Sequence, residues 1–565
     1  MKIKKLLISN ISTVILILTL LSMPVSAKEI ADYLADVPFD MPELAAPVFP
    51  ENSVNITDFG AVGDGHTMNT EAIQKAIEAC VSAGGGQVII PEGIWYTEPI
   101  QLRSNIDLHL ECGALLQFPG YSDSYPLVEI VWDGVGRYRC RAPIFGYRLE
   151  NVAITGEGII DGAGDLWRPV KKNKMTERQW QNLLASGGAV DNREDIWWPS
   201  EKAMNGVDYL RKLESSGKNV TKEAYRGAAE YLRPVMINLV ECKNVLLDGP
   251  TFQNSPGWNI HPLMCENLII RNINVRNPWY SQNGDGMDLE SCKNALVYNC
   301  RFDVGDDAMC LKSGRDEAGR KRGIPTENVV IEDCVVYHGH GGFTVGSEMS
   351  GGIRNISVRH CSFIGTDVGL RFKSTRGRGG VVENIYISNI LMKEIPAEAI
   401  RFNMYYNGSA PIPEDGEENV LLNVPVPPVT EETPRFHKIF IDNIVCRGAL
   451  NAVFLQGLPE MPIQKIELSN IYMTAKNGLT CIDAQAVKMN NIRILPDEGP
   501  IFHLHNSQDI MIEKVTVPEE MEPAVYLTGS KTSEIHINED DFINLKNKIK
   551  CGQDVVPDPS WQDMK

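Results

Sequence analysis

The stretch NLIIRNI at residues 267–273 returns as NALVYNC at residues 294–300. Both stretches begin with asparagine and continue with alternating apolar residues, a pattern typical of β-strands. A coil this short cannot bury its own apolar face, so successive coils are expected to stack. The repeat therefore predicts an all-β fold, a single-stranded right-handed parallel β-helix or solenoid. Further copies, at spacings of roughly 23 to 34 residues, begin at Asn244, Asn328, Asn355 and Asn384.

A second strand in each coil predicts which side chains face inward. Aligning these strands gives two apolar ladders, one of Met287, Met309, Phe343 and Leu370 and one of Leu289, Leu311, Val345 and Phe372. Successive residues of a strand point to opposite faces, so the residues between the ladders should line one outer wall. That wall holds Asp288, Glu290, Lys312, Arg371 and Lys373. Asparagines at the turns can hydrogen-bond one another along the stack.

Three segments depart from the repeat. Residues 50–104 contain an amphipathic helix pattern after Asn69, which we expect to cap the N-terminal end of the solenoid. Residues 165–232 have helical composition and four tryptophans, and residues 407–437 form a proline- and glutamate-rich loop. Repeat proteins tend to place insertions on the binding face, so we expect both insertions there, within one β-helix domain over residues 28–565.

The first 27 residues read as an export signal. Lys2, Lys4 and Lys5 form a positive start, residues 14–21 an apolar run, and residues 25–27 a small-residue cleavage site. The run is too short for a good membrane span. We therefore expect a mature protein without membrane insertion, located in the periplasm or outside the cell.

Charge and cysteine content restrict the partners. The net charge is -19, which disfavours nucleic acid and anionic lipid, and any anionic substrate must meet a local cationic patch. The 13 cysteines include no CxxC pair and no zinc spacing, so we expect no metal and no cofactor. Six of them lie beside apolar runs and are expected in the core: Cys242, Cys265, Cys292, Cys300, Cys334 and Cys361.

Acidic residues recur at the start of this second strand on successive coils. In the alignment Asp285 is equivalent to Asp307, and Asp306 to His340. Parallel coils lie about 4.8 Å apart, so these side chains should form one cluster. Repulsion among them should raise at least one pKa and supply a protonated acid beside an ionised base. Arg371 and Lys373 would lie beside them, with the cationic patch continued by Arg376 and Arg378.

Each of these features alone also fits a structural role. Asp285 suits a turn in Asn-Gly-Asp-Gly, and Asp306-Asp307 a calcium site or a solvated turn. His340 suits a hydrogen-bonded core position, and the Arg371 and Lys373 pair a solvated face. Their occurrence in register on consecutive coils favours a functional site.

The ordered set of motifs resembles the polygalacturonases, glycoside hydrolase family 28. The motifs are Asn-x-Asp at residues 283–285, Gly-Asp-Asp at 305–307, Gly-His-Gly at 339–341 and Arg-x-Lys at 371–373. Residues 333–347, DCVVYHGHGGFTVGS, fit the family's signature around its histidine, and the resemblance spans about residues 59–470. The family more often has Asn-Thr-Asp and Arg-Ile-Lys, but the functional residue types are kept here.

The resemblance implies inverting hydrolysis of α-1,4-galacturonosyl bonds in pectic polysaccharide or oligogalacturonides. It implies that Asp306 is the general acid, that Asp285 and Asp307 activate water, and that His340 tunes the acid. Inverting enzymes hold their carboxyls about 6.5–9.5 Å apart. The substrate-binding residues implied by the resemblance are Asn283, Arg371, Lys373 and Tyr406.

The sequence leaves alternatives open for where along the polymer the enzyme cuts and for which polymer it cuts. Insertions can close one end of a groove, so we expect exo action, although the tryptophan-rich insertion could simply pack on the coil. A rhamnogalacturonan hydrolase, a calcium-dependent pectate lyase and a non-catalytic polysaccharide-binding β-helix are the rivals. The Gly-His-Gly motif favours hydrolysis over elimination, and the two cations favour galacturonate beside the cleaved bond.

Overall fold

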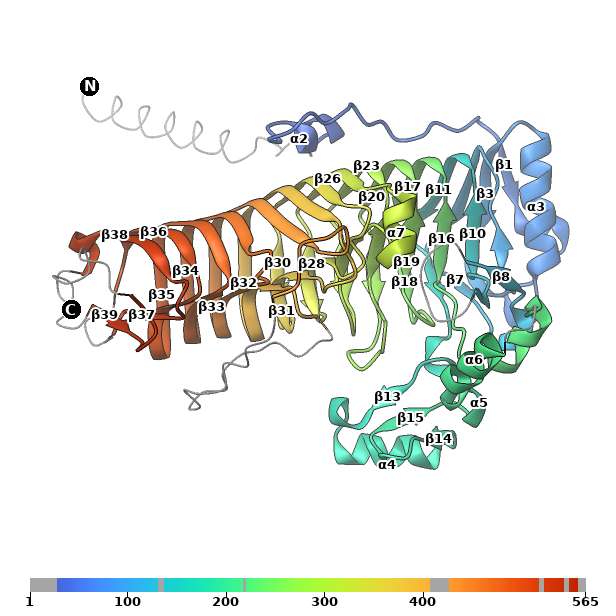
Figure 1. Cartoon of the computed structure of the whole chain (residues 1–565). Coiled ribbons are helices and arrows are strands. Elements are labelled where there is room, and N and C mark those ends of the chain that lie inside the picture. Colours follow the sequence, from blue (N-terminus) through green and yellow to red (C-terminus); the bar gives the residue numbers. More distant parts are fainter. Residues whose placement is uncertain are drawn as a thin grey trace, which may run out of the picture.

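The computed structural model describes residues 28–130, 137–216, 220–406, 426–517, 523–542 and 548–556. Its parallel strands stack along one axis, with α3 (Thr70–Ser82) at one end (Figure 1). The predicted parallel β-helix is confirmed. The predicted export signal at residues 1–27 and residues 407–425 of the second insertion lie outside the described residues.

Successive coils pair in three parallel stacks. The first contains β11 (Glu150–Gly156), β17 (Lys243–Asp248), β20 (Glu266–Arg271), β23 (Lys293–Tyr298), β26 (Thr326–Glu332) and β29 (Ile353–Arg359). The second contains β12 (Ile159–Asp161), β18 (Thr251–Gln253), β21 (Asn274–Arg276), β24 (Arg301–Asp303), β27 (Val335–His338) and β30 (Ser362–Ile364). The third contains β10 (Ile144–Tyr147), β16 (Ile237–Val240), β19 (Ile260–Leu263), β22 (Met287–Glu290), β25 (Met309–Lys312), β28 (Gly341–Gly346) and β31 (Val368–Lys373).

The third stack has the predicted register. Met287 pairs with Met309, Met309 with Phe343, and Phe343 with Leu370, and the second ladder follows two residues later. All these side chains are fully buried in the main core. Burying each large apolar side chain contributes roughly 1.5–3 kcal/mol, and a slip of one residue would turn the whole set outward.

Asparagines form a hydrogen-bonded ladder at the turn before the first stack. Asn267 donates to Asn244 at 3.1 Å, and Asn294 donates to Asn267 at 3.1 Å. Asn328 and Asn355 continue the series at 3.1 and 3.0 Å. These residues adopt φ between 55° and 60°, a left-handed conformation that asparagine tolerates better than most residues. The turn geometry therefore explains why asparagine opens each repeat.

Most of the cysteines lie in the core. Of the 13, 11 are buried, including the six predicted as core residues. Cys242, Cys265 and Cys292 follow the third stack on three successive coils, where a small side chain fits between neighbouring turns.

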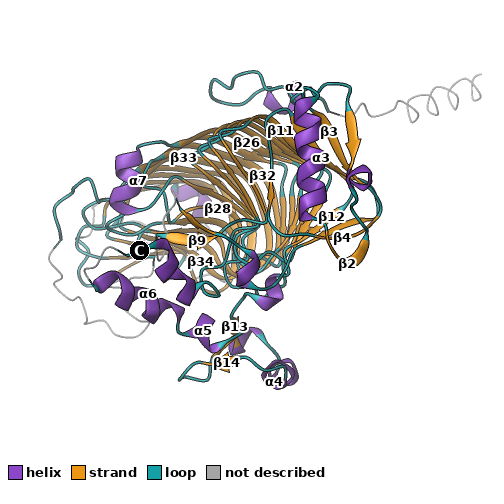
Figure 2. Ribbon diagram, turned by 90° about the vertical axis from the view of Figure 1, so that its right-hand side faces the viewer, coloured by secondary structure: helices purple, strands orange, loops and turns teal. Residues whose placement is uncertain are grey.

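The N-terminal end and the first insertion carry most of the helical residues. Helix α3 buries Ile73, Ala76 and Ile77 against the first coils and so covers core that would be open (Figure 2). The first insertion holds α4 (Glu177–Ala185), α5 (Glu201–Met204), α6 (Gly206–Ser215) and a small antiparallel sheet of β13 (Val170–Lys171), β14 (Ala189–Val190) and β15 (Ile196–Trp198). Trp180 and Trp197 are buried with Val170 inside the insertion itself. None of the described helices is long and apolar enough to cross a membrane.

Residues 28–49, which we call the N-terminal strap, cover the outer face of the first stack. Helix α2 (Ile30–Leu34) begins the strap (Figure 1). The ring of Tyr33 stacks on Tyr298 at 4.1 Å between centroids, and the strap buries outward residues of the stack such as Leu296 and Val330. Sequence reasoning missed this contact, because the sheet residues alternate normally and the strap has no repeat of its own.

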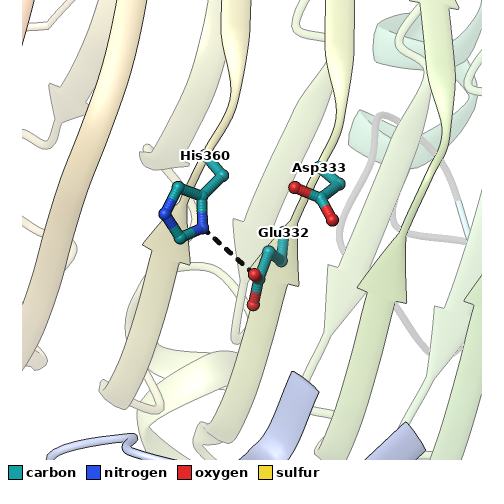
Figure 3. Close-up of side chains that lie close together, drawn as sticks. All are labelled: Glu332, Asp333 and His360. Carbon is teal, nitrogen blue, oxygen red and sulfur yellow. Dashed lines mark hydrogen bonds and ion pairs between the residues drawn. The ribbon is translucent and has the colours of Figure 1, made fainter. Parts of the chain in front are cut away.

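An acidic cluster anchors the start of the strap. Lys28 Nζ lies 2.7 Å from Glu332 and 3.0 Å from Asp333. Arg359 Nε at 2.6 Å and His360 Nδ1 at 3.1 Å also contact Glu332, as Figure 3 shows for His360. Burial raises the Glu332 pKa, but these partners outweigh it and the pKa is lowered. The carboxylates are thus occupied by protein cations, so the cluster is an anchor for the strap.

We expect Tyr33→Ala to reduce the free energy of unfolding by about 2–4 kcal/mol, because it removes the stacked ring and exposes apolar sheet residues. Urea unfolding followed by fluorescence measures this change. Tyr121→Ala, at a site 52% exposed, is the control and should change the free energy by less than about 1 kcal/mol. Equal effects of the two substitutions would show that the strap contributes little to stability.

Candidate active site

Stacking brings the predicted carboxylates together. The Gly286 N–H donates to the Asp307 carbonyl and the Ala308 N–H to the Gly341 carbonyl, both at 2.9 Å, which fixes the predicted equivalences. One oxygen from each of Asp285, Asp306 and Asp307 lies within 4.8 Å of the others. The three residues lie just before β22 and β25, at the edge of the outer wall, as expected.

Two cations neutralise Asp307. Arg371 Nη1 donates to one carboxylate oxygen at 2.7 Å and Lys373 Nζ to the other at 2.6 Å. Burial raises the Asp307 pKa, but Lys373 and Arg371 outweigh it and hold the pKa well below its usual range. Asp307 is therefore an ionised base. Three clustered oxygens could also ligate a cation, but here both oxygens of Asp307 are already bound by protein.

Asp306 is paired with His340. Oδ1 of Asp306 lies 3.1 Å from His340 Nδ1, and Oδ2 accepts the Asn283 backbone N–H at 3.2 Å. Burial raises the Asp306 pKa, but the hydrogen bond and charge of His340 outweigh it and the pKa is lowered. The Asp306 carboxyl therefore favours its ionised form beside His340. At 19% side-chain exposure, Asp306 is accessible to a substrate.

Asp285 is the carboxyl that favours a proton. It is 3% exposed, and its Oδ1 has no hydrogen-bond partner among the described residues. Burial first, then the charges of Asp288 and Asp306, raise its pKa well above the usual range. A raised pKa thus falls on Asp285, with burial as its main cause and repulsion as the lesser one, whereas the resemblance makes Asp306 the acid.

Asp288 is a fourth carboxyl in the cluster. The sequence placed it on the outer wall without a role, and the structure buries it completely, 3.5 Å from Lys312 Nζ. Burial raises its pKa to about 7 although Lys312 lowers it. The alternation along β22 predicts that the Asp288 side chain points outward. It does not predict that neighbouring residues cover this side chain and bury it.

The predicted cationic patch is smaller than expected. Tyr406 joins Arg371 and Lys373, with the lysine Nζ 4.9 Å from the centre of its ring. Arg376, in contrast, forms two hydrogen bonds with Glu460 at 2.6 and 2.8 Å, and Arg378 pairs with Asp316. The prediction that these two arginines extend a free patch is wrong, because acidic residues distant in sequence neutralise them.

Arg233 positions Asn283 and was missed from the sequence. It follows the first insertion, and its guanidinium donates to Asn283 Oδ1 and to the Gln282 carbonyl, both at 2.9 Å. Burial, together with neighbouring arginines, lowers its pKa to about 10. No periodicity marks such a residue, because its position depends on how the insertion returns to the coil.

A groove of about 960 Å³ reaches His340. Its floor follows the second stack and its turns, with Asp161, Gln253, Arg276, Asp303 and His338 in successive coils. Lys174 from the first insertion and Trp279 also line it, and Trp279 Nε1 donates to the Lys174 carbonyl at 2.9 Å. The insertion therefore borders the groove beside the cluster.

Fold and site together define a polysaccharide-cleaving enzyme built on a parallel β-helix. The family model described as "Glycosyl hydrolases family 28" matches residues 213–444, and a second, "Rhamnogalacturonase A/epimerase, pectate lyase-like", matches residues 53–110. The chain belongs to glycoside hydrolase family 28 and is a polygalacturonase-like hydrolase.

Individual proteins similar to this chain are described as polygalacturonases or galacturonosidases. A probable polygalacturonase of Vitis vinifera is 29% identical over 469 residues, covering 80% of this chain and 82% of its own. An exo-poly-alpha-D-galacturonosidase of Dickeya chrysanthemi is 28% identical over 445 residues, covering 74% and 71%. The crystal structure of an exopolygalacturonase from Thermotoga maritima is 31% identical, with a TM-score of 0.63 and coverage of 83% and 94%.

Replacing Asp285 with asparagine should stabilise the fold while removing a predicted catalytic group. The folded-state pKa lies above the ordinary value of 3.8, so ionisation costs stability at every pH above that value. We expect a gain of about 1–3 kcal/mol near pH 8 that shrinks as the pH falls towards 4. Thermal unfolding at both pH values measures it.

Asp303→Asn is the control, because this carboxylate is 43% exposed and lies in the coil of Asp307. It should show no gain near pH 8. Equal unfolding temperatures for Asp285→Asn and the parent protein at both pH values would contradict the raised pKa.

Proposed function

We propose that the protein hydrolyses α-1,4-galacturonosyl linkages of pectin by an inverting, exo-acting mechanism. The family implies a pectic substrate. The observation that carries the proposal is the register that places the Asp306–His340 pair beside an ionised Asp307 and the cations Arg371 and Lys373. This arrangement supplies both an acid and a base to one small patch of the outer wall.

Each residue has a role in the proposed reaction. Asp306 protonates the leaving oxygen with the proton it shares with His340. Asp307, already ionised, removes a proton from the attacking water, and the protonated Asp285 orients that water. Asn283, Arg371, Lys373 and Tyr406 hold the sugar. Because Arg371 and Lys373 already contact Asp307, a galacturonate carboxylate would share these cations with it.

The distance between the carboxyl groups bears on the proposed stereochemistry. A separation of about 6.5–9.5 Å is usual for inverting glycosidases. Here one oxygen of each of the three aspartates lies within 4.8 Å of the others, so their nearest atoms are close, and the separation of the whole carboxyl groups stays a prediction. In the proposed reaction the attacking water binds beside Asp307 and Asp285.

Exo action is supported by the first insertion. Lys174 and Trp279, linked by a hydrogen bond, form part of the groove wall that also contains His340. Two of the similar proteins are described as exo-acting. A wall of this kind favours binding of a chain terminus over binding of an internal segment.

A rhamnogalacturonan hydrolase is the second candidate. The groove is lined by hydroxyl-binding groups such as Asp161, Gln253 and Asn254, and the two cations of the cluster are engaged by Asp307. Such groups suit a neutral sugar as well as a galacturonate. The match of residues 53–110 to a rhamnogalacturonase and epimerase model also favours testing this polymer.

Incubation with polygalacturonate tests the proposal. We expect release of mono- or digalacturonate from the earliest times, an initial product of inverted anomeric configuration by proton NMR, and a rate at least about 100-fold lower for Asp306→Asn. Rhamnogalacturonan is the comparison polymer. An early ladder of long oligomers would exclude exo action, and an unsaturated ultraviolet-absorbing product would identify a lyase. Equal rates for Asp306→Asn and the parent enzyme would overturn the assignment of the acid.

We also propose that the protein is exported, to the periplasm or the medium, with removal of residues 1–27. The positive start, apolar run and small-residue site support this. N-terminal sequencing of protein recovered outside the cytoplasm should begin at Lys28. Recovery of the full chain only from the cytoplasm would contradict export.

A further inference from the structure

His340 is flanked by two carboxylates. Its Nδ1 lies 3.1 Å from Asp306 Oδ1, and its Nε2 lies 3.7 Å from Asp367 Oδ2. Asp367 stands just before β31, and its backbone N–H donates to the Gly339 carbonyl at 2.8 Å. The next residue, Val368, donates to the His340 carbonyl at 3.1 Å. The stacking of coils therefore holds Asp367 against the ring whether or not the side chains are charged.

A lysine from the first insertion contacts the same carboxylate. Lys174 Nζ lies 3.7 Å from Asp367 Oδ2, the oxygen that faces His340. Lys174 ends the short 3-10 turn Lys172–Lys174, and its carbonyl accepts the Trp279 Nε1 hydrogen at 2.9 Å. One ionic contact and one hydrogen bond thus join the insertion to two turns of the β-helix, the turn before β31 and the turn before β22.

We propose that Asp367 and Lys174 are positioning residues that set the protonation of the His340–Asp306 pair with opposite signs. The proposal rests on the proposed roles of His340 and Asp306 as the source of the leaving-group proton. A negative charge at Asp367 stabilises a proton on the pair. A positive charge at Lys174 competes with the imidazole for that carboxylate and so weakens the effect.

The other charges around His340 are paired among themselves. Asp307, from the turn that carries Asp306, is bound by Arg371 and Lys373. Asp303, from the preceding strand, lies 2.8 Å from His338 along the groove. Among the described residues around His340, Asp367 is thus the carboxylate that faces its Nε2, and Lys174 is the cation that reaches Asp367 from the insertion.

The signs follow from the reaction. The active enzyme must carry a proton on the pair, so activity falls on the alkaline side when this proton is lost. Asp367→Asn removes the charge that retains it, so the alkaline limb should move to lower pH. Lys174→Met removes the competing cation, so the limb should move to higher pH. Charges of partly exposed side chains at about 3–4 Å typically shift a pKa by about 0.5–1 unit. We expect the alkaline limb of the pH–activity profile to move by the same amount.

The pH dependence of kcat/KM on a galacturonate oligomer tests the inference. The variants are Asp367→Asn, Lys174→Met and both together, with Lys172→Met as the matched control. Lys172 shares the turn but faces the Trp180 ring at 5.9 Å. We expect opposite shifts for the two single variants and no shift for the control. The double variant should follow Asp367→Asn, because Lys174 acts through that carboxylate.

Alkaline limbs that coincide with the parent enzyme, or that move in the same direction for both single variants, would overturn the inference. A fall in kcat without movement of the limb would also overturn it, because that is the result of a purely structural role. Failure of the proposed function looks different: the parent enzyme would release no sugar, or Asp306→Asn would be as active as the parent.

Discussion

The parallel register of the coils is the constraint on which the site depends. Strands about 4.8 Å apart place equivalent residues of neighbouring coils side by side. Two buried ladders, with Met309 and Leu311 in their central rung, fix that register, because a slip of one residue would expose every ladder side chain. The same rung distance brings Asp285 against Asp307 and Asp306 against His340, so apolar packing positions groups that would otherwise repel one another.

Compensation of buried charge determines which of the clustered acids can ionise. Asp307 stays ionised because Arg371 and Lys373 each take one oxygen, whereas Asp285 has an oxygen with no partner among the described residues and favours the neutral form. Burying an isolated carboxylate is costly, and an opposite charge within hydrogen-bond distance offsets that cost. The four aspartates therefore differ in charge although they lie on two adjacent coils, because their partners differ.

Sequence periodicity could predict the contacts that repeat from coil to coil. It could predict few of the contacts that irregular segments, distant in the sequence, make with the coils. The two ladders, the asparagine stack and the equivalence of Asp285 with Asp307 all follow from alternation and repeat spacing, and the structure agrees. Arg233 and the strap residue Tyr33 carry no such signal, because their contacts form only when irregular segments fold back on the coils. Arg376 was misjudged for the same reason, since Glu460 lies 84 residues away in the chain.

Repetition alone cannot make one position of a solenoid a catalytic site, because each coil presents a similar wall to solvent. The irregular parts remove this equivalence. The first insertion reaches the wall at Asp367 through Lys174, and its return segment supplies Arg233 to Asn283, so one segment contacts both sides of the acidic cluster. A shift of the insertion would then alter the groove and the charges beside His340 together. Restricted access to the groove and the supply of the proton would thereby depend on the same docking contacts.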